Sequence, residues 1–137
     1  MAVKVGKAAS VNLAGNKVAE MGTFSISGFT REALEDTEFG DDVKSYLFGI
    51  GDGGEVSFSG NYSDTDTTGQ DLLNAACSNG SLFGSGQLRF YIDSVSYWTI
   101  GSGGTVLITK CKAISFEKAG IGTIEFTGKL SGVMVLV

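Results

Sequence analysis

The sequence predicts a mainly β protein with one short helix. Apolar and polar residues alternate along several short segments, glycine occupies 21 of the 137 positions, and long helical patterns are rare. Alternation with a period of two is typical of strands that bury one face, and glycine suits the tight turns that join such strands. Proline, which often blunts the edges of sheets, is absent. We expect one domain over residues 1–137, because this length supports a single core.

The first 60 residues contain two clear strands. Residues 1–20 are expected to form an arm or a short strand pair that turns at Ala14-Gly15-Asn16. In residues 23–29, Phe24 and Ile26 fall on one face, and serine and threonine fall on the other. An apolar run over residues 43–50 and the turn signal Asp52-Gly53-Gly54 precede a second alternating strand at residues 55–60.

Between these strands lies a strongly acidic segment, residues 30–44. It holds six acidic and two basic residues, a net charge of −4 in a chain whose net charge is −5. We expect a long acidic loop here, because a connection of this length with few apolar anchors is more often functional than structural. A short helix over Arg-Glu-Ala-Leu-Glu-Asp is the alternative, since these residues favour helices.

One helix is predicted at about residues 68–78. Thr67 or Thr68 would be its N-cap, with Gln70 or Asp71 completing a capping box, and Asn79-Gly80 would end it. The expected apolar face is made by Leu72, Leu73, Ala76 and Cys77. Four further strands follow, at residues 87–92, 95–100, 105–118 and 122–132. In the last of these, Ile124, Phe126 and Leu130 share one face.

The composition excludes several kinds of chemistry. Histidine is absent, so Ser/His/Asp and Cys/His catalysis and histidine-bound metals are excluded. Asp64, Asp66 and Gly69 resemble the start of a calcium loop, but Ala75 stands where the bidentate glutamate belongs, so a turn before a helix is the preferred interpretation. The glycine-rich residues 101–104 lack the lysine of a P-loop and are interpreted as a hairpin turn. We expect no enzymatic activity, metal or cofactor.

The two cysteines, Cys77 and Cys111, are interpreted as buried free thiols rather than a disulfide, because a chain of this size needs no covalent staple. The N-terminus lacks the apolar core of a signal peptide, and the final Val-Met-Val-Leu-Val is too short to span a bilayer. Synthesis in the cytoplasm and no membrane association are therefore expected.

The order of the motifs resembles that of a known family. Residues 28–50, GFTREALEDTEFGDDVKSYLFGI, are followed by residues 52–75, DGGEVSFSGNYSDTDTTGQDLLNA. The succession of a strand, an acidic segment with threonine and Gly-Asp, a strand, a Gly-Asn-Tyr turn and a helix resembles the tail tube (major tail) proteins of long-tailed bacteriophages. The similarity extends loosely through residues 88–93 and the C-terminal strand pair, and no single motif is diagnostic.

The resemblance implies a β-sandwich or partly rolled barrel with one flanking helix. It implies a structural virion protein that forms stacked hexameric rings, whose sheets join into an inner barrel that conducts DNA during ejection. The implied partners are copies of the chain, the tape measure, terminator and baseplate proteins, and DNA that passes without specific binding. The implied location is the virion tail, after assembly in the host cytoplasm.

The acidic loop would contact neighbouring subunits and the adjacent ring. The expected contact residues are Arg31, Glu32, Glu35, Asp36, Thr37, Glu38, Asp41 and Asp42. Residues 1–20 and 105–137 each have a net charge of +2, so basic surfaces of a neighbour would complement the loop. The candidate basic partners are Lys4, Lys7, Lys110 and Lys112. Acidic residues lining the bore would let DNA slide, because an acidic surface releases no counterions from phosphates.

Two alternatives remain open. One is another structural tail component, such as a tail terminator or a baseplate hub protein. The other is a carbohydrate-binding β-sandwich that uses Tyr91, Tyr97 and Trp98, although aromatic residues that alternate on strands are more often part of a core or an interface.

Overall fold

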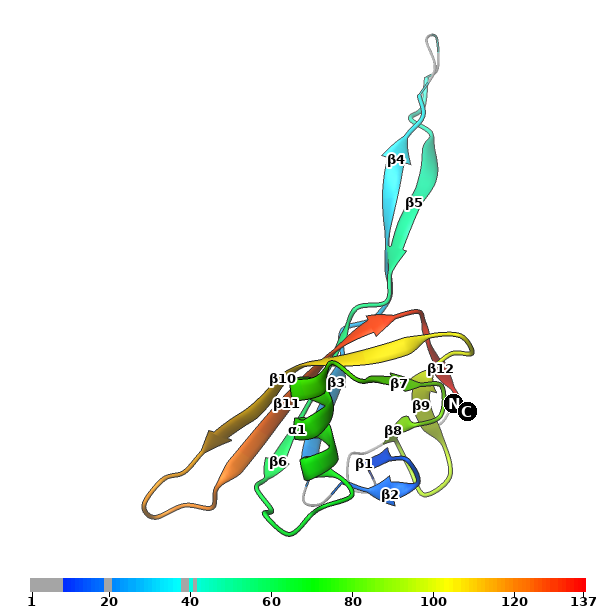
Figure 1. The fold of residues 1–137 in the computed structure, drawn as a ribbon. Helices are drawn as coiled ribbons and strands as arrows, with labels where there is room; N and C mark the ends of the chain where they lie inside the picture. Colours follow the sequence, from blue (N-terminus) through cyan, green and yellow to red (C-terminus); the bar gives the residue numbers. More distant parts are fainter. Residues whose placement is uncertain (1–8, 19–20, 38–39, 41) are drawn as a thin grey trace.

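The computed structural model describes residues 9–18, 21–37, 40 and 42–137 (Figure 1). Two antiparallel sheets pack against each other, and a two-stranded arm projects from them. Sheet 1 has the order β12-β9-β8-β1-β2, and sheet 2 has the order β3-β6-β11-β10-β7. The prediction of a mainly β, sandwich-like protein with one helix is confirmed.

The strands are short, apart from two in sheet 2. Sheet 1 consists of β1 (Ser10–Leu13), β2 (Asn16–Lys17), β8 (Leu88–Tyr91), β9 (Tyr97–Ile100) and β12 (Met134–Leu136). Sheet 2 consists of β3 (Met21–Ile26), β6 (Glu55–Asn61), β7 (Leu82–Gly84), β10 (Thr105–Ser115) and β11 (Thr123–Ser131). The arm pairs β4 (Thr30–Glu35) with β5 (Tyr46–Asp52), and the helix α1 spans Gln70–Asn79. The three-residue strands β7 and β12 are not predicted from the sequence.

The core lies between the two sheets and is centred on aromatic rings. The ring of Phe58 on β6 stacks on Phe126 of β11 at 5.4 Å between centroids, and it meets Phe90 of β8 edge-on at 5.6 Å. Phe24 of β3 packs on the same Phe90 at 5.3 Å. The predicted buried faces of these strands are confirmed, since Ile124, Phe126 and Leu130 are all buried and their polar neighbours face outward.

The helix lies close to its predicted position, but its N-terminal cap was predicted wrongly. The structure places Gly69 at the N-cap instead of Thr67 or Thr68. The backbone N–H of Gln70 donates to the Asp66 carboxylate over 3.0 Å, so the side chain that caps this end comes from the preceding turn. At the other end, Gly80 has a φ of +73° and its N–H donates to the carbonyl of Ala76, which confirms the predicted stop.

The interpretation of the cysteines as free thiols was wrong. Cys77 on α1 and Cys111 on β10 form a disulfide, with Cα atoms 6.1 Å apart. The helix lies against β10, so residues separated by 34 positions become neighbours, and nothing local in the sequence reveals this. Beside the disulfide, the N–H of Lys112 donates to Asn74 of the helix over 3.0 Å. Lys112 has a φ of +55° and lies where the β10–β11 register shifts.

The expectation of an acidic loop or short helix at residues 30–44 was also wrong in part. Residues 30–35 form strand β4, which pairs with β5 from Thr30↔Asp52 to Glu35↔Tyr46. Tyr46, Leu47 and Phe48 favour a strand, and pairing with them outweighs the helix propensity of β4. Of the described residues between Glu35 and Tyr46, which are 36–37, 40 and 42–45, none belongs to a strand or helix.

Candidate assembly surfaces

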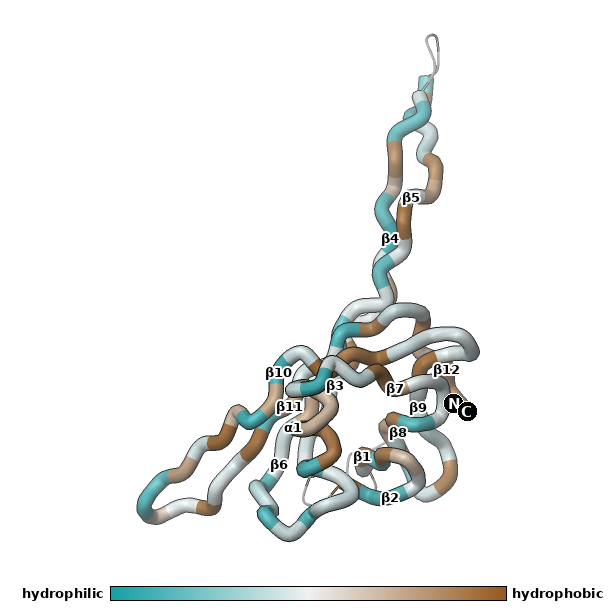
Figure 2. Tube along the Cα trace, viewed as in Figure 1, coloured by the Kyte–Doolittle hydropathy of each residue, from teal (hydrophilic) through white to brown (hydrophobic). Residues whose placement is uncertain are grey.

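The β4–β5 arm is the most unusual surface of the described chain, because large apolar side chains lie along it and are exposed. Phe48 is 84% exposed and Ile50 is 90% exposed. Val43, Tyr46, Leu47, Leu34 and Phe29 are also exposed large apolar or aromatic residues of this segment. Figure 2 shows hydrophobic stretches along the arm, which stands clear of the two sheets. An exposed apolar surface of this kind marks an interaction site.

Both faces of the arm carry apolar side chains. Residues that oppose each other in an antiparallel pair project to the same face, which places Ala33 with Phe48, and Leu34 with Leu47 on the opposite face. Arg31 joins the Phe48 face: its guanidinium carbon lies 5.2 Å from the ring centroid of Phe48 and 5.3 Å from that of Phe29. These cation–π contacts hold the aromatic side chains in place at the surface.

The root of the arm is built from closely packed glycines. A Cβ atom on Gly53 would lie 1.9 Å from the carbonyl oxygen of Gly132, so only glycine fits between the two segments. Gly54 has a φ of +85°, and its N–H donates to the Asp52 carboxylate over 2.9 Å. A Cβ atom on Gly51 would meet the ring of Phe29 at 2.3 Å. The direction in which the arm leaves the sheets is therefore fixed by backbone packing.

The predicted contact residues of the acidic segment lie on the arm as far as they are described. Arg31, Glu32, Glu35, Asp36, Thr37 and Asp42 are all exposed. The Thr37 hydroxyl donates to the Glu35 carboxylate over 3.1 Å and accepts from the N–H of Ser45 over 3.3 Å, which ties the two strands together above Tyr46. Glu38 and Asp41 lie outside the described residues.

The candidate basic partners are dispersed. Lys4 and Lys7 lie outside the described residues. Lys110 forms an ion pair with Glu125 at 3.2 Å on sheet 2, and Lys112 lies in the irregular part of β10 beside the helix. Within the described part of one chain, no ion pair joins these lysines to the arm, so a contact with the acidic segment requires a second copy.

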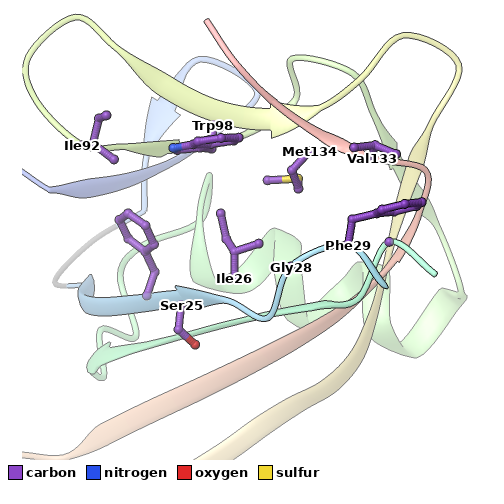
Figure 3. A pocket seen from close by; sticks show the side chains of 10 residues that line it. Ser25, Ile26, Gly28, Phe29, Ile92, Trp98, Val133 and Met134 are labelled. Carbon is purple, nitrogen blue, oxygen red and sulfur yellow. The ribbon is translucent and has the colours of Figure 1, made fainter. Parts of the chain in front are cut away.

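An apolar groove of about 530 Å³ opens beside the root of the arm (Figure 3). Ile26 and Phe29 line one side, and Trp98, Val133 and Met134 line the other. No local pattern of the sequence marks this groove, because its walls come from β3, β9 and β12, which are distant in the sequence.

The fold is shared with chains of known tail structures. The chain matches a chain of the virion of a native gene transfer agent particle with a TM-score of 0.72 and 17% identity, covering 98% of this chain and 99% of that chain. It matches a chain of the sheath-tube complex of an extracellular contractile injection system, PVC, with a TM-score of 0.70 and 11% identity, covering 98% and 91% of the two chains. It also matches a chain of the tube terminating cap of the anti-feeding prophage, with a TM-score of 0.69 and 11% identity, covering 100% and 92%.

The chain therefore shares its fold with chains of a gene transfer agent particle and of a sheath-tube complex. The likeness extends over essentially the whole chain and supports the resemblance found in the sequence. No protein-family model matches the sequence, and no curated protein sequence matches it significantly.

The three aromatic residues Tyr91, Tyr97 and Trp98 do not form a common binding platform. Tyr97 and Trp98 are consecutive on β9 and therefore point to opposite faces, and Trp98 packs against the core. Tyr91 and Tyr97 pair on the outer face with ring centroids 5.0 Å apart, and Arg89 stacks on Tyr97 at 4.6 Å. A hydrogen bond to the Tyr91 hydroxyl raises the pKa of Arg89 above its ordinary value.

Asp64, Asp66 and Gly69, which resemble the start of a calcium loop, lie at the N-terminal end of the helix α1. Asp66 accepts a hydrogen bond from the N–H of Gln70. This contact agrees with the prediction that the segment is a turn before a helix. In the part of the chain that the structure describes, no group of three or more aspartate, glutamate or cysteine side chains lies close enough to hold a metal ion. No helix within that part is long and apolar enough to cross a membrane.

Proposed function

We propose that this chain is a structural, non-enzymatic subunit that polymerises into stacked hexameric rings and forms the tube of a phage-like tail, through which DNA is ejected. The exposed arm carries this proposal. An isolated two-stranded hairpin is marginally stable in water, and this one exposes apolar side chains on both faces. Such an arm becomes well ordered when neighbouring copies cover it, which the tail-tube fold supports.

Because the arm has two apolar faces, we expect each face to contact a different neighbouring copy of the chain. The face with Phe29, Arg31 and Phe48 differs in chemistry from the face with Leu34 and Leu47. An arm that lies between two copies buries both faces. Because the acceptor surfaces differ from the arm itself, the contact is heterologous, and heterologous contacts generate rings when they close and filaments when they do not.

Sheet 2 offers a second contact along its ends. The strand β3 is an end strand of this sheet and contains no proline. At the other end, β7 pairs only with Thr105, Val106 and Leu107, so most of β10 has no strand on that side within the described residues. We infer that β3 of one copy continues the sheet of the next, which closes a ring around a barrel. The helix covers this edge of β10 at Cys111 and Lys112, and strand edges that no neighbour covers favour pairing between chains.

The remaining partners follow from this role. The tube would contact a tape measure inside it, a terminator at one end and a baseplate at the other, and it would be assembled in the host cytoplasm and reside in the virion tail. DNA would pass through without specific binding.

Charge reversal on the arm tests this proposal. Replacing Glu35 and Asp36 together with lysine changes the charge of the arm by +4 and should shorten or abolish the polymers seen by sedimentation velocity. A control that reverses Asp64 and Asp71, which are also exposed but lie away from the arm, should polymerise normally. Equal polymer length in the two double variants would show that the acidic residues of the arm play no part in assembly.

A tail terminator is the second candidate, because a chain of a sheath/tube terminator structure shares the fold with a TM-score of 0.71. Fold cannot separate the two roles, but copy number can. A tube subunit is present in many rings per particle, whereas a terminator is present in one. Quantitative mass spectrometry of purified particles distinguishes these cases.

A further inference from the structure

The disulfide between Cys77 and Cys111 joins the helix α1 to strand β10, and these two residues are the only cysteines in the sequence. Both side chains are partly buried and pack against the core. Disulfides persist in oxidising surroundings and are rare in a reducing cytoplasm. A chain that is assembled in the host cytoplasm, as the proposed function requires, carries these residues there as two thiols.

Other contacts hold the helix in place, so the two cysteines lie side by side even before a bond joins them. Leu73 of the helix is fully buried in the core. The buried side chain of Gln70 donates to the carbonyl of Asn61 over 2.9 Å. Next to the disulfide, the N–H of Lys112 donates to the side-chain oxygen of Asn74 over 3.0 Å. The reduced chain therefore keeps α1 on β10 and presents two neighbouring thiols.

We propose that Cys77 and Cys111 form a redox latch that is open while the tube is assembled and closes in the finished tube, once the particle reaches oxidising surroundings. This inference rests on the proposed function, because it requires assembly in a reducing cytoplasm. The Cα atoms of the pair lie 6.1 Å apart, a separation that a disulfide spans, so the bond fits the packing of α1 on β10. The latch closes within one subunit and joins no two copies.

A small-molecule disulfide such as oxidised glutathione is the class of oxidant that closes the latch. The thiolate of one cysteine attacks a sulfur atom of the reagent, which gives a mixed disulfide and releases one small thiol. The thiolate of the other cysteine then attacks the protein sulfur of the mixed disulfide, which forms the protein disulfide and releases a second small thiol. The two protons of the protein thiols end on the two released thiols. The protein is oxidised by two electrons, and the reagent is reduced by two.

Closing the latch stabilises the subunit and leaves its outer surfaces unchanged. The bond closes a loop across 34 positions, which restricts the unfolded chain. Asn74 holds the helix over β10 in either state, and the β4–β5 arm projects from the sheets at a distance from the helix (Figure 1). The reduced subunit therefore remains able to assemble, and the finished tube gains resistance to denaturation.

Oxidation of tubes that were assembled under reducing conditions tests the latch. The unmodified chain and Cys77→Ser are assembled with a reductant, the reductant is removed, and oxidised glutathione is added. The measurements are the free thiols per chain, the mass of the chain, and the urea concentration at which half of the subunits unfold. Cys77→Ser is the matched control, because its remaining thiol can take up glutathione but cannot close the latch. If this variant does not fold, Cys111→Ser replaces it.

For the unmodified chain, we expect both thiols to disappear without the added mass of glutathione, while the tubes keep their form. The urea midpoint should rise by about 1–2 M, and that of the control should stay where it is. Thiols that persist, or glutathione that stays attached to both cysteines, would overturn the proposal. An unchanged urea midpoint would overturn it equally. A reduced chain that does not fold would also overturn it, because the bond would then be needed before assembly.

Failure of the folded, reduced chain to form tubes would instead count against the proposed function. Dispersed subunits are then oxidised in the same way, and their thiol count and urea midpoint decide whether the latch closes in the folded subunit.

Discussion

Replacing Phe48 with serine should block polymerisation while the subunit stays folded. Phe48 is 84% exposed on β5 and touches neither sheet core. Its described interaction within the chain is the cation–π contact with Arg31 at 5.2 Å, worth about 0.5–1 kcal/mol at an exposed site. The free energy of unfolding should therefore fall by no more than about 1 kcal/mol.

The cost to assembly should be larger. An aromatic side chain buries roughly 150–250 Å² in a contact, so burial of the exposed part of Phe48 contributes about 3–5 kcal/mol at about 25 cal/mol per Å². Since each 1.4 kcal/mol is a factor of ten, the critical concentration for polymerisation should rise by at least roughly 100-fold. Val95→Ser is the matched control, because Val95 is 76% exposed but lies in the turn between β8 and β9.

Two measurements decide the outcome. Urea denaturation of the dispersed protein reports the stability of the subunit, and pelleting over a concentration series reports the critical concentration. The reasoning is refuted if Phe48→Ser polymerises at the concentration of the unmodified chain. It is also refuted if the Val95 control loses assembly to the same degree, because burial of the arm would then have no special part in polymerisation.

Two predictions concern the subunit itself. Cys111→Ala should lower the free energy of unfolding by up to about 4 kcal/mol, since the disulfide to Cys77 closes a loop across 34 positions; titration of two free thiols in the oxidised native protein would contradict this. Gly53→Ala should cost about 2 kcal/mol or more, because the new methyl group meets the backbone of Gly132. Gly22→Ala, which meets no atom within 4 Å, should change stability little, and equal losses in urea denaturation would show that close packing at the arm root is unimportant.

The elements that local patterns predict well are those with one buried face. Strand β11 alternates throughout, β6 alternates from Glu55 to Ser59 and β3 from Thr23 to Ile26, and the inward-facing side chains of these stretches are those that the sequence indicates. The helix was also predicted, because its apolar spacing and Gly80 are local signals. The strand β4 was not predicted, because it is stabilised by pairing with β5 rather than by a buried face. In addition, the propensities of Ala33, Leu34 and Glu35 favour a helix.

The assembly surfaces were only partly predictable. The acidic residues of the arm are the ones that stand out in the sequence, whereas the structure shows that Phe48 and Ile50 are its most exposed large apolar side chains. In a sequence, an apolar run such as residues 43–50 is normally interpreted as buried. Its exposure follows from the position of the hairpin, which projects away from the two sheets. The disulfide and the groove both join segments far apart in the sequence, so no local pattern marks them.

Electron cryomicroscopy of the concentrated, purified chain tests the central claim most directly. We expect hollow tubes of stacked six-membered rings in which the β4–β5 arm of each subunit lies between neighbouring copies and its apolar residues are buried. Chains that remain dispersed at every concentration, or closed assemblies in which the arm touches no neighbour, would contradict the proposal that this chain builds a tube.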